Sequence, residues 1–257
     1  MLQIIRTRLK QGHRTIPFPA KPPKLPKRFC GKPMIDQAKC RQDCHNCVDV
    51  CPTDAIVVDP EGIKIDLGRC LFCGECGAVC PEKAIHHTHD HILAARNRED
   101  LVIRQGVETD RIWDDKIRKM FGRSLKLRQV SAGGCGACEA NTNALNTIVF
   151  DLGRFGIQFV ASPRHADGLL ITGPVTQNMK LALEKTYAAV PSPKIVIAVG
   201  ACAISGGVYL NHPVGADLCV CPMCVCPSIL PVDLYIPGCP PHPLTILDGL
   251  LRLLGRL

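Results

Sequence analysis

CLFCGECGAVCPEKAI, from Cys70 to Ile85, is the second copy of a cysteine pattern that occurs twice in this chain. The first copy, CHNCVDVCPTDAI, runs from Cys44 to Ile56, and its cysteines, its proline and its Ala-Ile pair all align with the second copy. Two short strand patterns, IVVD and IKID, accompany the repeat. An internal repeat of this kind predicts two equivalent halves that pack together into one small unit.

The cysteine spacing of the repeat indicates iron–sulfur ligation. The second half has the C-x2-C-x2-C-x3-C-P run of two-cluster bacterial ferredoxins, in which the fourth cysteine binds the other cluster. The first half has one extra residue between Cys40 and Cys44, and we expect the longer loop still to reach. Two zinc sites are the alternative, although zinc modules rarely repeat three cysteines with a fourth before proline.

This pattern predicts two crossed sets of ligands. The first cysteine group is Cys40, Cys44, Cys47 and Cys80, and the second cysteine group is Cys70, Cys73, Cys76 and Cys51. Each group is expected to hold one [4Fe–4S] cluster.

A further pair of cysteines lies in SAGGCGACEAN, residues Ser131 to Asn141. A C-x-x-C motif at a helix start fits a redox dithiol, half of a zinc site or half of an iron–sulfur site. The residues around it alternate between strand and helix patterns, which predicts a parallel sheet with helices on both faces. The strands are expected at 124–130, 157–162, 166–172, 194–200 and 232–238, and the helices at 139–155, 177–190 and 243–257.

More cysteines follow two of the expected strands. Cys202 comes after KIVIAVG, and Cys239 comes after VDLYIPG. Because the carboxyl ends of parallel strands share one edge of the sheet, these thiols are expected to meet the C-x-x-C pair there. The third cysteine group is therefore Cys135, Cys138, Cys202 and Cys239, which predicts a third [4Fe–4S] cluster.

The motifs of this half also carry a family resemblance. GCGACEAN, PRHADGLLITGPVT, GACAISGG and YIPGCPPHP resemble the small subunit of group 4 membrane-bound [NiFe] hydrogenases, such as formate hydrogenlyase, and the homologous complex I subunit that holds the terminal cluster. Complex I places its first two cysteines side by side, so the C-G-A-C spacing favours the hydrogenase branch. GHRTIPFP and KRFCGKPMID resemble the ferredoxin-like subunit of the same complexes. The chain therefore looks like a fusion of two neighbouring subunits.

The resemblance implies a function without bond-making chemistry in this polypeptide. The fold class is α+β and α/β, with a two-cluster ferredoxin domain followed by a flavodoxin-like parallel-sheet domain. The three clusters would pass electrons from a donor, either ferredoxin or a formate dehydrogenase module, to a catalytic large subunit. Membrane subunits of a complex I-like assembly would complete the complex on the cytoplasmic face of the inner membrane. The alternative is the same electron path to a large subunit that lacks nickel and reduces a quinone or another acceptor.

The domain organisation follows from composition and motifs. We expect a basic, proline-rich arm at 1–35, the ferredoxin domain at 36–92, a charged linker of mostly helical pattern at 93–123 and the sheet domain at 124–257. The arm holds nine Lys or Arg residues and no acidic residue, and its first part is amphipathic. It is expected either to be disordered or to lie as a helix and strap on a membrane surface or a partner subunit.

Two other classes of protein, nucleic-acid-binding proteins and secreted or membrane-spanning proteins, are not expected. The formal charge of +8 raises nucleic-acid binding as a hypothesis, but no helicase, nuclease or glycosylase signature accompanies it, so no nucleic acid is expected as a partner. The N-terminal residues have no apolar signal region, and no segment is long and apolar enough to span a bilayer. Cysteines in a reducing compartment are metal ligands before they are disulfides.

Some chemistry-bearing residues remain outside the three groups. CVCPMCVC holds Cys219, Cys221, Cys224 and Cys226, which either bind an additional metal or form a loop of free thiols. Cys30 is expected to be a small buried residue, and HHTHDH (86–91) to begin a solvated helix rather than a metal site. Glu139, beside a cluster ligand, is either a proton relay or a first-turn acidic residue that complements the helix dipole.

Overall fold

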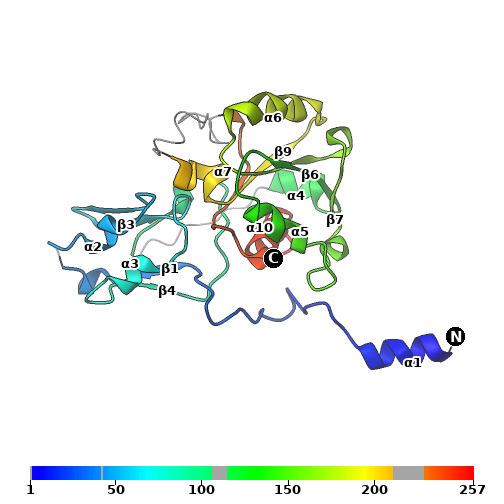
Figure 1. Cartoon of the computed structure of the whole chain (residues 1–257). Helices are drawn as coiled ribbons and strands as arrows, with labels where there is room; N and C mark the ends of the chain where they lie inside the picture. The colour runs from blue at the N-terminus through cyan, green and yellow to red at the C-terminus, as the bar shows by residue number, and fades with distance from the viewer. Residues whose placement is uncertain (1, 42, 106–114, 211–228) are drawn as a thin grey trace.

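The computed structural model of the chain describes residues 2–41, 43–105, 115–210 and 229–257 (Figure 1). Its C-terminal half is built on a five-stranded parallel sheet with the order β7-β6-β8-β9-β10. In sequence order this is 2-1-3-4-5, the flavodoxin-like arrangement, as the sequence predicted. The strands are β6 (Leu125–Ser131), β7 (Ile157–Phe159), β8 (Gly168–Thr172), β9 (Ile195–Val199) and β10 (Leu234–Ile236).

The central strands of this sheet are buried on both faces. Every residue of β8 and β9 is buried, which matches their unbroken apolar sequences. Leu169 and Ile171 of β8 pack into one apolar cluster, and Leu170 packs into another on the opposite face. The helices of this half are α4 (Asp115–Phe121), α5 (Ala137–Ala144), α6 (Gln177–Ala189), α7 (Ala201–Ser205) and α10 (Pro243–Leu253).

The ferredoxin-like half is made of short elements around the cysteine repeat. A three-stranded antiparallel sheet has the order β2-β3-β5, and β1 pairs with β4. The helices α2 and α3 begin at equivalent points of the two repeats. The elements are β1 (Pro33–Ile35), α2 (Asn46–Asp49), β2 (Ile56–Asp59), β3 (Gly62–Asp66), α3 (Glu75–Ala78), β4 (Ile85–His87) and β5 (Val102–Ile103).

The two halves share one of the apolar clusters. Ile65 and Leu101 of the ferredoxin-like half belong to the same cluster as Ile171 and Ile204 of the sheet half. Ala95 also exchanges two backbone hydrogen bonds with Tyr235, so the chain between the halves covers the free edge of β10. Covering an edge strand in this way removes its unpaired backbone groups from solvent.

Three segments differ from their predicted secondary structure. The expected helix at 139–155 ends at Ala144, where the Thr147 hydroxyl donates to the Ala144 carbonyl that the next helical turn needs. The segment 93–103 forms no α-helix: it contains only the short 3-10 helix Glu99–Leu101, and Val102 and Ile103 then pair with β3. The histidine run starts in β4, paired with β1, and not in a helix. The expected domain boundaries stay a prediction.

The arm has two parts with different surroundings. α1 (Leu2–Gln11) has no buried residue and projects away from the rest of the chain (Figure 1). The following segment lies on the sheet half, where the Ile16 amide donates to the Val149 carbonyl and the Phe18 side chain is 7% exposed. Arg154 donates to the Phe18 carbonyl at 2.8 Å, so this part of the arm is an ordered strap and not a free tail.

We predict that Phe18→Ala destabilises the chain by about 3 kcal/mol, because it removes a buried aromatic side chain from a packed cluster. Denaturant unfolding of the cluster-loaded chain measures the loss, and limited proteolysis should cut the strap faster. Leu9→Ala is the matched control, because Leu9 is 79% exposed. Equal stability of the two variants would contradict the packing role of the strap.

Candidate iron–sulfur sites

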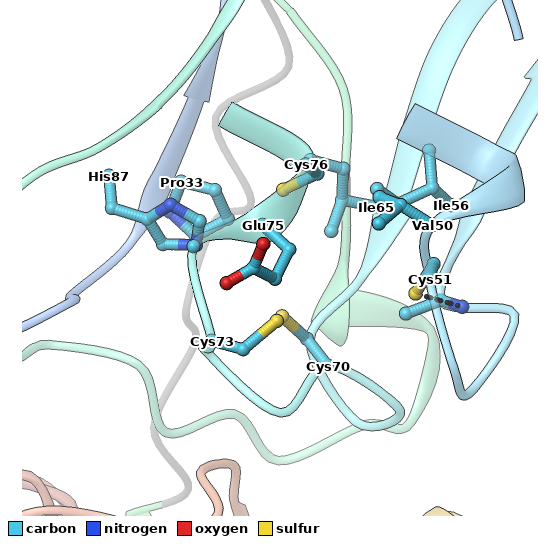
Figure 2. Close-up of a pocket in the computed structure, with 12 residues that line it drawn as sticks. Pro33, Val50, Cys51, Ile56, Ile65, Cys70, Cys73, Glu75, Cys76 and His87 are labelled. Carbon is cyan, nitrogen blue, oxygen red and sulfur yellow. Dashed lines mark hydrogen bonds between the residues drawn. The ribbon is translucent and has the colours of Figure 1, made fainter. Parts of the chain in front are cut away.

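The cysteines of the repeat border two separate cavities. One cavity of about 340 Å³ is lined by Cys40, Cys44, Cys47 and Cys80, which are the predicted first group. The other, of about 360 Å³, is lined by Cys51, Cys70, Cys73 and Cys76, which are the predicted second group (Figure 2). In each case the fourth cysteine comes from the other half of the repeat.

The backbone turns of the two repeats place amide groups on sulfur. The Ala55 amide donates to Cys51 Sγ at 3.3 Å, and the Ala84 amide donates to Cys80 Sγ at 3.2 Å. Asp54 and Lys83, which precede these alanines, both have positive φ (49° and 52°). The C-P-x-x-A part of each repeat therefore forms the same turn, which aims an amide at the cysteine that crosses over.

The third group is assembled from loops at one edge of the parallel sheet. Cys135 and Cys138 follow β6, Cys202 is the second residue of α7 after β9, and Cys239 follows β10. The Ala201 amide donates to the Gly238 carbonyl at 2.9 Å, which joins the last two loops. The Asn141 side chain donates to the Pro241 carbonyl at 2.9 Å and so ties α5 to the Cys239 loop.

Burial and mutual repulsion act on these thiols. Burial first, and then the charges of Cys202, Glu139, Cys239 and Cys135, together raise the pKa of Cys138 to about 12. Burial likewise raises the pKa of Cys202 to about 12, with Cys239 and Cys135 adding to the effect. The four thiols thus lie within electrostatic reach of one another.

The second group shows the same behaviour. Burial first, with a smaller contribution from neighbouring cysteines, raises the pKa of Cys70 to about 12 and that of Cys76 to about 11. Groups of thiols that resist ionisation become thiolate ligands when a bound cation compensates their charge. In the described residues, no three His, Cys, Asp or Glu side chains are close enough to hold one metal ion. Sets of four cysteine thiolates are the ligands that [4Fe–4S] clusters use, so the chemistry of each donor set fits such a group.

Glycines make room for the sulfurs of the third group. Gly200 has φ +91°, and a Cβ at this position would lie 2.6 Å from Cys138 Sγ. A Cβ on Gly207 would lie 3.0 Å from Cys202 Sγ. Gly200 and Gly207, two of the three glycines in GACAISGG, thus allow close approach of backbone to sulfur.

Glu139 is held by two hydroxyl groups. Ser131 and Thr172 donate to its Oε1 atom at 2.5 and 2.6 Å. Burial raises the pKa of Glu139, but these hydrogen bonds lower it by more, so the carboxylate form is favoured. Its side chain lines an open depression of about 1000 Å³ between β6, α5 and α6.

The remaining residues have varied positions. Cys30 is partly exposed instead of buried, and a Cβ on Gly74 would lie 3.8 Å from its sulfur. His87, from the histidine run that follows the second cysteine motif, lines the cavity of the second group with a buried Nε2 atom that has no hydrogen-bond partner among the described residues (Figure 2). The cysteines of CVCPMCVC lie outside the described residues.

Comparison with known proteins agrees with both halves. Residues 26–84 match the 4Fe-4S dicluster domain, and residues 135–253 match the family described as NADH ubiquinone oxidoreductase, 20 Kd subunit. The probable membrane-bound hydrogenase subunit mbhJ of Pyrococcus furiosus is 42% identical over 55% of this chain and 81% of its own length. The chain belongs to this NADH ubiquinone oxidoreductase subunit family.

Other members of the oxidoreductase subunit family span both branches. Formate hydrogenlyase subunit 7 of Escherichia coli is 44% identical over 55% of this chain, which spans about half (52%) of that relative's length. An NADH-quinone oxidoreductase subunit of Citrifermentans bemidjiense is 44% identical over 48% of this chain and 68% of its own length. A chain of the membrane-bound sulfane sulfur reductase, an archaeal respiratory membrane complex, is 33% identical with a TM-score of 0.45 over 56% of this chain and 75% of that chain.

These matches confirm the predicted fusion. An iron–sulfur dicluster domain and an oxidoreductase small-subunit domain lie in one polypeptide that belongs to the complex I-like oxidoreductases. In the described part of the chain, no helix has the length and apolar character to cross a bilayer.

We predict that Gly200→Ala lowers the iron content of the purified chain, because the added methyl group meets Cys138 Sγ. Gly136→Ala is the matched control, since Gly136 also has positive φ (84°) but nothing lies within 4 Å of its Cβ position. Iron and acid-labile sulfide per chain measure the difference. Equal iron in the two variants would show that backbone strain, and not contact with sulfur, governs this position.

Proposed function

We propose that the chain is an electron-transfer subunit that holds three [4Fe–4S] clusters, one in each cysteine group. The cluster ligands are Cys40, Cys44, Cys47 and Cys80; Cys51, Cys70, Cys73 and Cys76; and Cys135, Cys138, Cys202 and Cys239. The observation that carries the proposal is the convergence of thiols from three separate loops at one sheet edge. The half of the chain with this sheet shares an apolar cluster with the half that holds the other two groups of four cysteines. When bound, each cluster would supply one-electron redox chemistry.

The residues of the chain would set the properties of this electron path. Amides of Ala55, Phe72 and Ala84 donate to cysteine sulfur at 3.2–3.3 Å, and such hydrogen bonds raise the reduction potential of a cluster. Burial shields the Cys202 thiol, and in part the Cys70 thiol, from water. The protein would make and break no substrate bond, and its contribution would be position and potential.

We further propose that the partner at the third group is a hydrogenase-type large subunit. Cys135 and Cys239 are exposed, so the third group lies at the surface, where another subunit can approach. The names of two relatives, a membrane-bound hydrogenase subunit and a formate hydrogenlyase subunit, support this partner. An electron-donor module would meet the ferredoxin-like half, and membrane subunits would hold the assembly at the cytoplasmic face.

A second candidate keeps the same electron path with another terminus. The relative named as an NADH-quinone oxidoreductase subunit supports a large subunit that lacks nickel and reduces a quinone. The neighbouring large subunit decides between the two, since nickel ligation needs two C-x-x-C pairs. Hydrogen evolution by the purified complex tests the first candidate directly.

We predict about twelve irons per chain in the anaerobically purified protein, and about eight in Cys239→Ala. The substitution removes one ligand of the third group and should delete one signal from the EPR spectrum of the reduced protein. Cys30→Ala is the control, because Cys30 belongs to none of the three groups. Eight irons in the unsubstituted chain would remove the third cluster from the proposal, and sixteen would point to an additional cluster at Cys219, Cys221, Cys224 and Cys226.

Glu139 is the proposed proton relay between this chain and its large subunit. Its carboxylate lines the open depression beside the third group, where it can exchange protons with water and with a docked partner. Its place in the first turn of α5 and its two hydrogen bonds support a structural role equally well.

We predict that Glu139→Gln leaves the iron content unchanged and slows proton-dependent turnover of the assembled complex. An amide keeps the size and the hydrogen bonds of the side chain but cannot carry a proton. Electron transfer to a one-electron dye serves as the control reaction and should keep its rate. Equal slowing of both reactions would assign Glu139 a structural role.

A further inference from the structure

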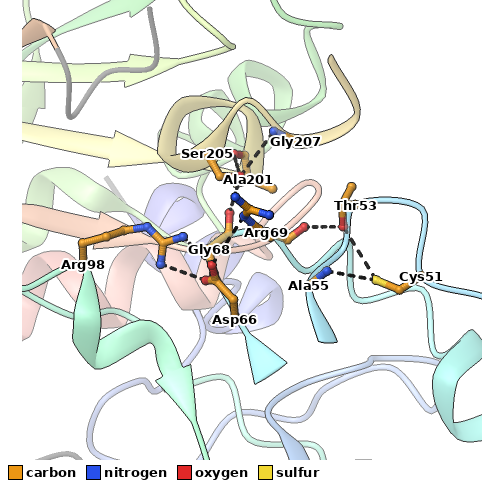
Figure 3. Close-up of polar contacts among 10 residues, drawn as sticks. All are labelled: Cys51, Thr53, Ala55, Asp66, Gly68, Arg69, Arg98, Ala201, Ser205 and Gly207. Atoms are coloured by element: carbon orange, nitrogen blue, oxygen red, sulfur yellow. Dashed lines mark hydrogen bonds and ion pairs between the residues drawn. The ribbon is translucent and has the colours of Figure 1, made fainter. Parts of the chain in front are cut away.

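A single hydroxyl group joins the loop of one cysteine group to the helix of another. Ser205 Oγ donates to the Gly68 carbonyl at 2.9 Å (Figure 3). Gly68 lies two residues before Cys70 of the second group, and Ser205 lies three residues after Cys202 of the third group. The Ser205 side chain is 7% exposed, so this contact is shielded from water.

The same hydroxyl also touches the backbone on both sides of Cys202. It lies 3.0 Å from the Ala201 carbonyl, whose carbon is bonded to the Cys202 amide, and it accepts from the Gly207 amide at 3.3 Å. Both the Gly68 and the Ala201 carbonyl oxygens lie within hydrogen-bonding distance of the Ser205 hydroxyl. A continuous chain of covalent and hydrogen bonds therefore runs from Cys70 through Gly68 and Ser205 to Cys202.

Two side chains pack closely against Gly68. A Cβ on Gly68 would lie 2.8 Å from Ile204 Cγ2 and 2.9 Å from Arg98 Cζ, so glycine allows this close approach without displacing either side chain. Asp66 Oδ1 accepts from the Gly68 amide at 2.8 Å. Asp66 is in turn held by both Arg98 Nη atoms, at 2.8 and 2.5 Å.

The other ligand-bearing loop of the second group is braced on the same segment. Thr53 Oγ1 donates to the Arg69 carbonyl at 2.8 Å and lies 3.9 Å from Cys51 Sγ (Figure 3). Gly68 and Arg69 are thus fixed from three sides: by Thr53 near Cys51, by the Asp66–Arg98 pair and by Ser205 of α7. A bidentate arginine–carboxylate pair holds such a segment in one geometry.

We propose that Ser205 is the positioning residue for electron transfer between the second and third cysteine groups. This inference rests on the proposed function, because it needs a cluster at each group. One electron moves, so that the centre at one group is oxidised and the centre at the other is reduced, with no bond made or broken. Ser205 holds the Cys70 loop against α7 and thereby sets the separation of the two centres and the bonded path between them.

The test uses the full-length, cluster-loaded chain with Ser205→Ala. Rapid reduction followed by freeze-quenched EPR measures the rate at which the electron equilibrates between the two centres, and the spin–spin splitting of the fully reduced protein reports their separation. We expect several-fold slower equilibration and a weaker splitting. Ser205→Thr keeps the hydroxyl and should restore both towards the unsubstituted values.

Thr245→Val is the matched control, because Thr245 is buried in α10 and its hydroxyl has no partner among the described residues. This variant removes a buried hydroxyl that is not part of the Ser205–Gly68 contact, and it should leave the rate and the splitting unchanged. A Ser205→Ala protein with about twelve irons and an unaltered rate and splitting would overturn the inference. Fewer irons in the unsubstituted chain would instead count against the proposed function.

Arg98→Lys provides a second variant in case Ser205→Ala fails to hold its clusters. It keeps a positive charge but loses the two-pronged contact with Asp66 that fixes Gly68. We expect slower equilibration and a weaker splitting with full iron content. An unaltered rate and splitting in this variant would also refute the role of the Ser205–Gly68 contact.

Discussion

The common direction of the strands in the five-stranded sheet is the constraint on which the third cysteine group depends. Because all five strands run parallel, the loops after β6, β9 and β10 emerge at the same edge. Cys135 and Cys239 are more than a hundred residues apart in sequence and nevertheless belong to one cluster of thiols. An antiparallel strand at any of these positions would carry its cysteine to the opposite edge.

Burial of several thiols in a small space imposes a second requirement. Burial is the largest cause of the raised pKa values of Cys70, Cys138 and Cys202, and neighbouring thiolates add to the cost of ionising each of them. Backbone amides on Cys51 and Cys80 supply part of the compensation, and iron would supply the rest. Close packing of the thiols also requires space, and the absence of a side chain at Gly200 leaves room for Cys138 Sγ.

The two halves of the chain behave as one body. They are joined by a shared apolar cluster, by two backbone hydrogen bonds between Ala95 and Tyr235, and by the Ser205–Gly68 hydrogen bond. Fusion into one polypeptide removes the possibility that the ferredoxin-like unit dissociates from the parallel-sheet unit. The strap around Phe18 adds a fourth tie, from the N-terminal side.

The sequence by itself determined the repeat and the parallel-sheet class of the second half. It also predicts the two crossed groups of cysteines and the third group as sets of ligands. These conclusions follow from the spacing of the cysteines and the periodicity of apolar residues, which can be read directly from the order of residues along the chain. Only the tertiary structure decided that Val102 and Ile103 form a strand, that the histidine run is extended, and that Gly68 meets Ser205. Those outcomes depend on backbone hydrogen bonds and close packing between segments far apart in sequence. The residues of either segment alone do not indicate which other segment it will contact.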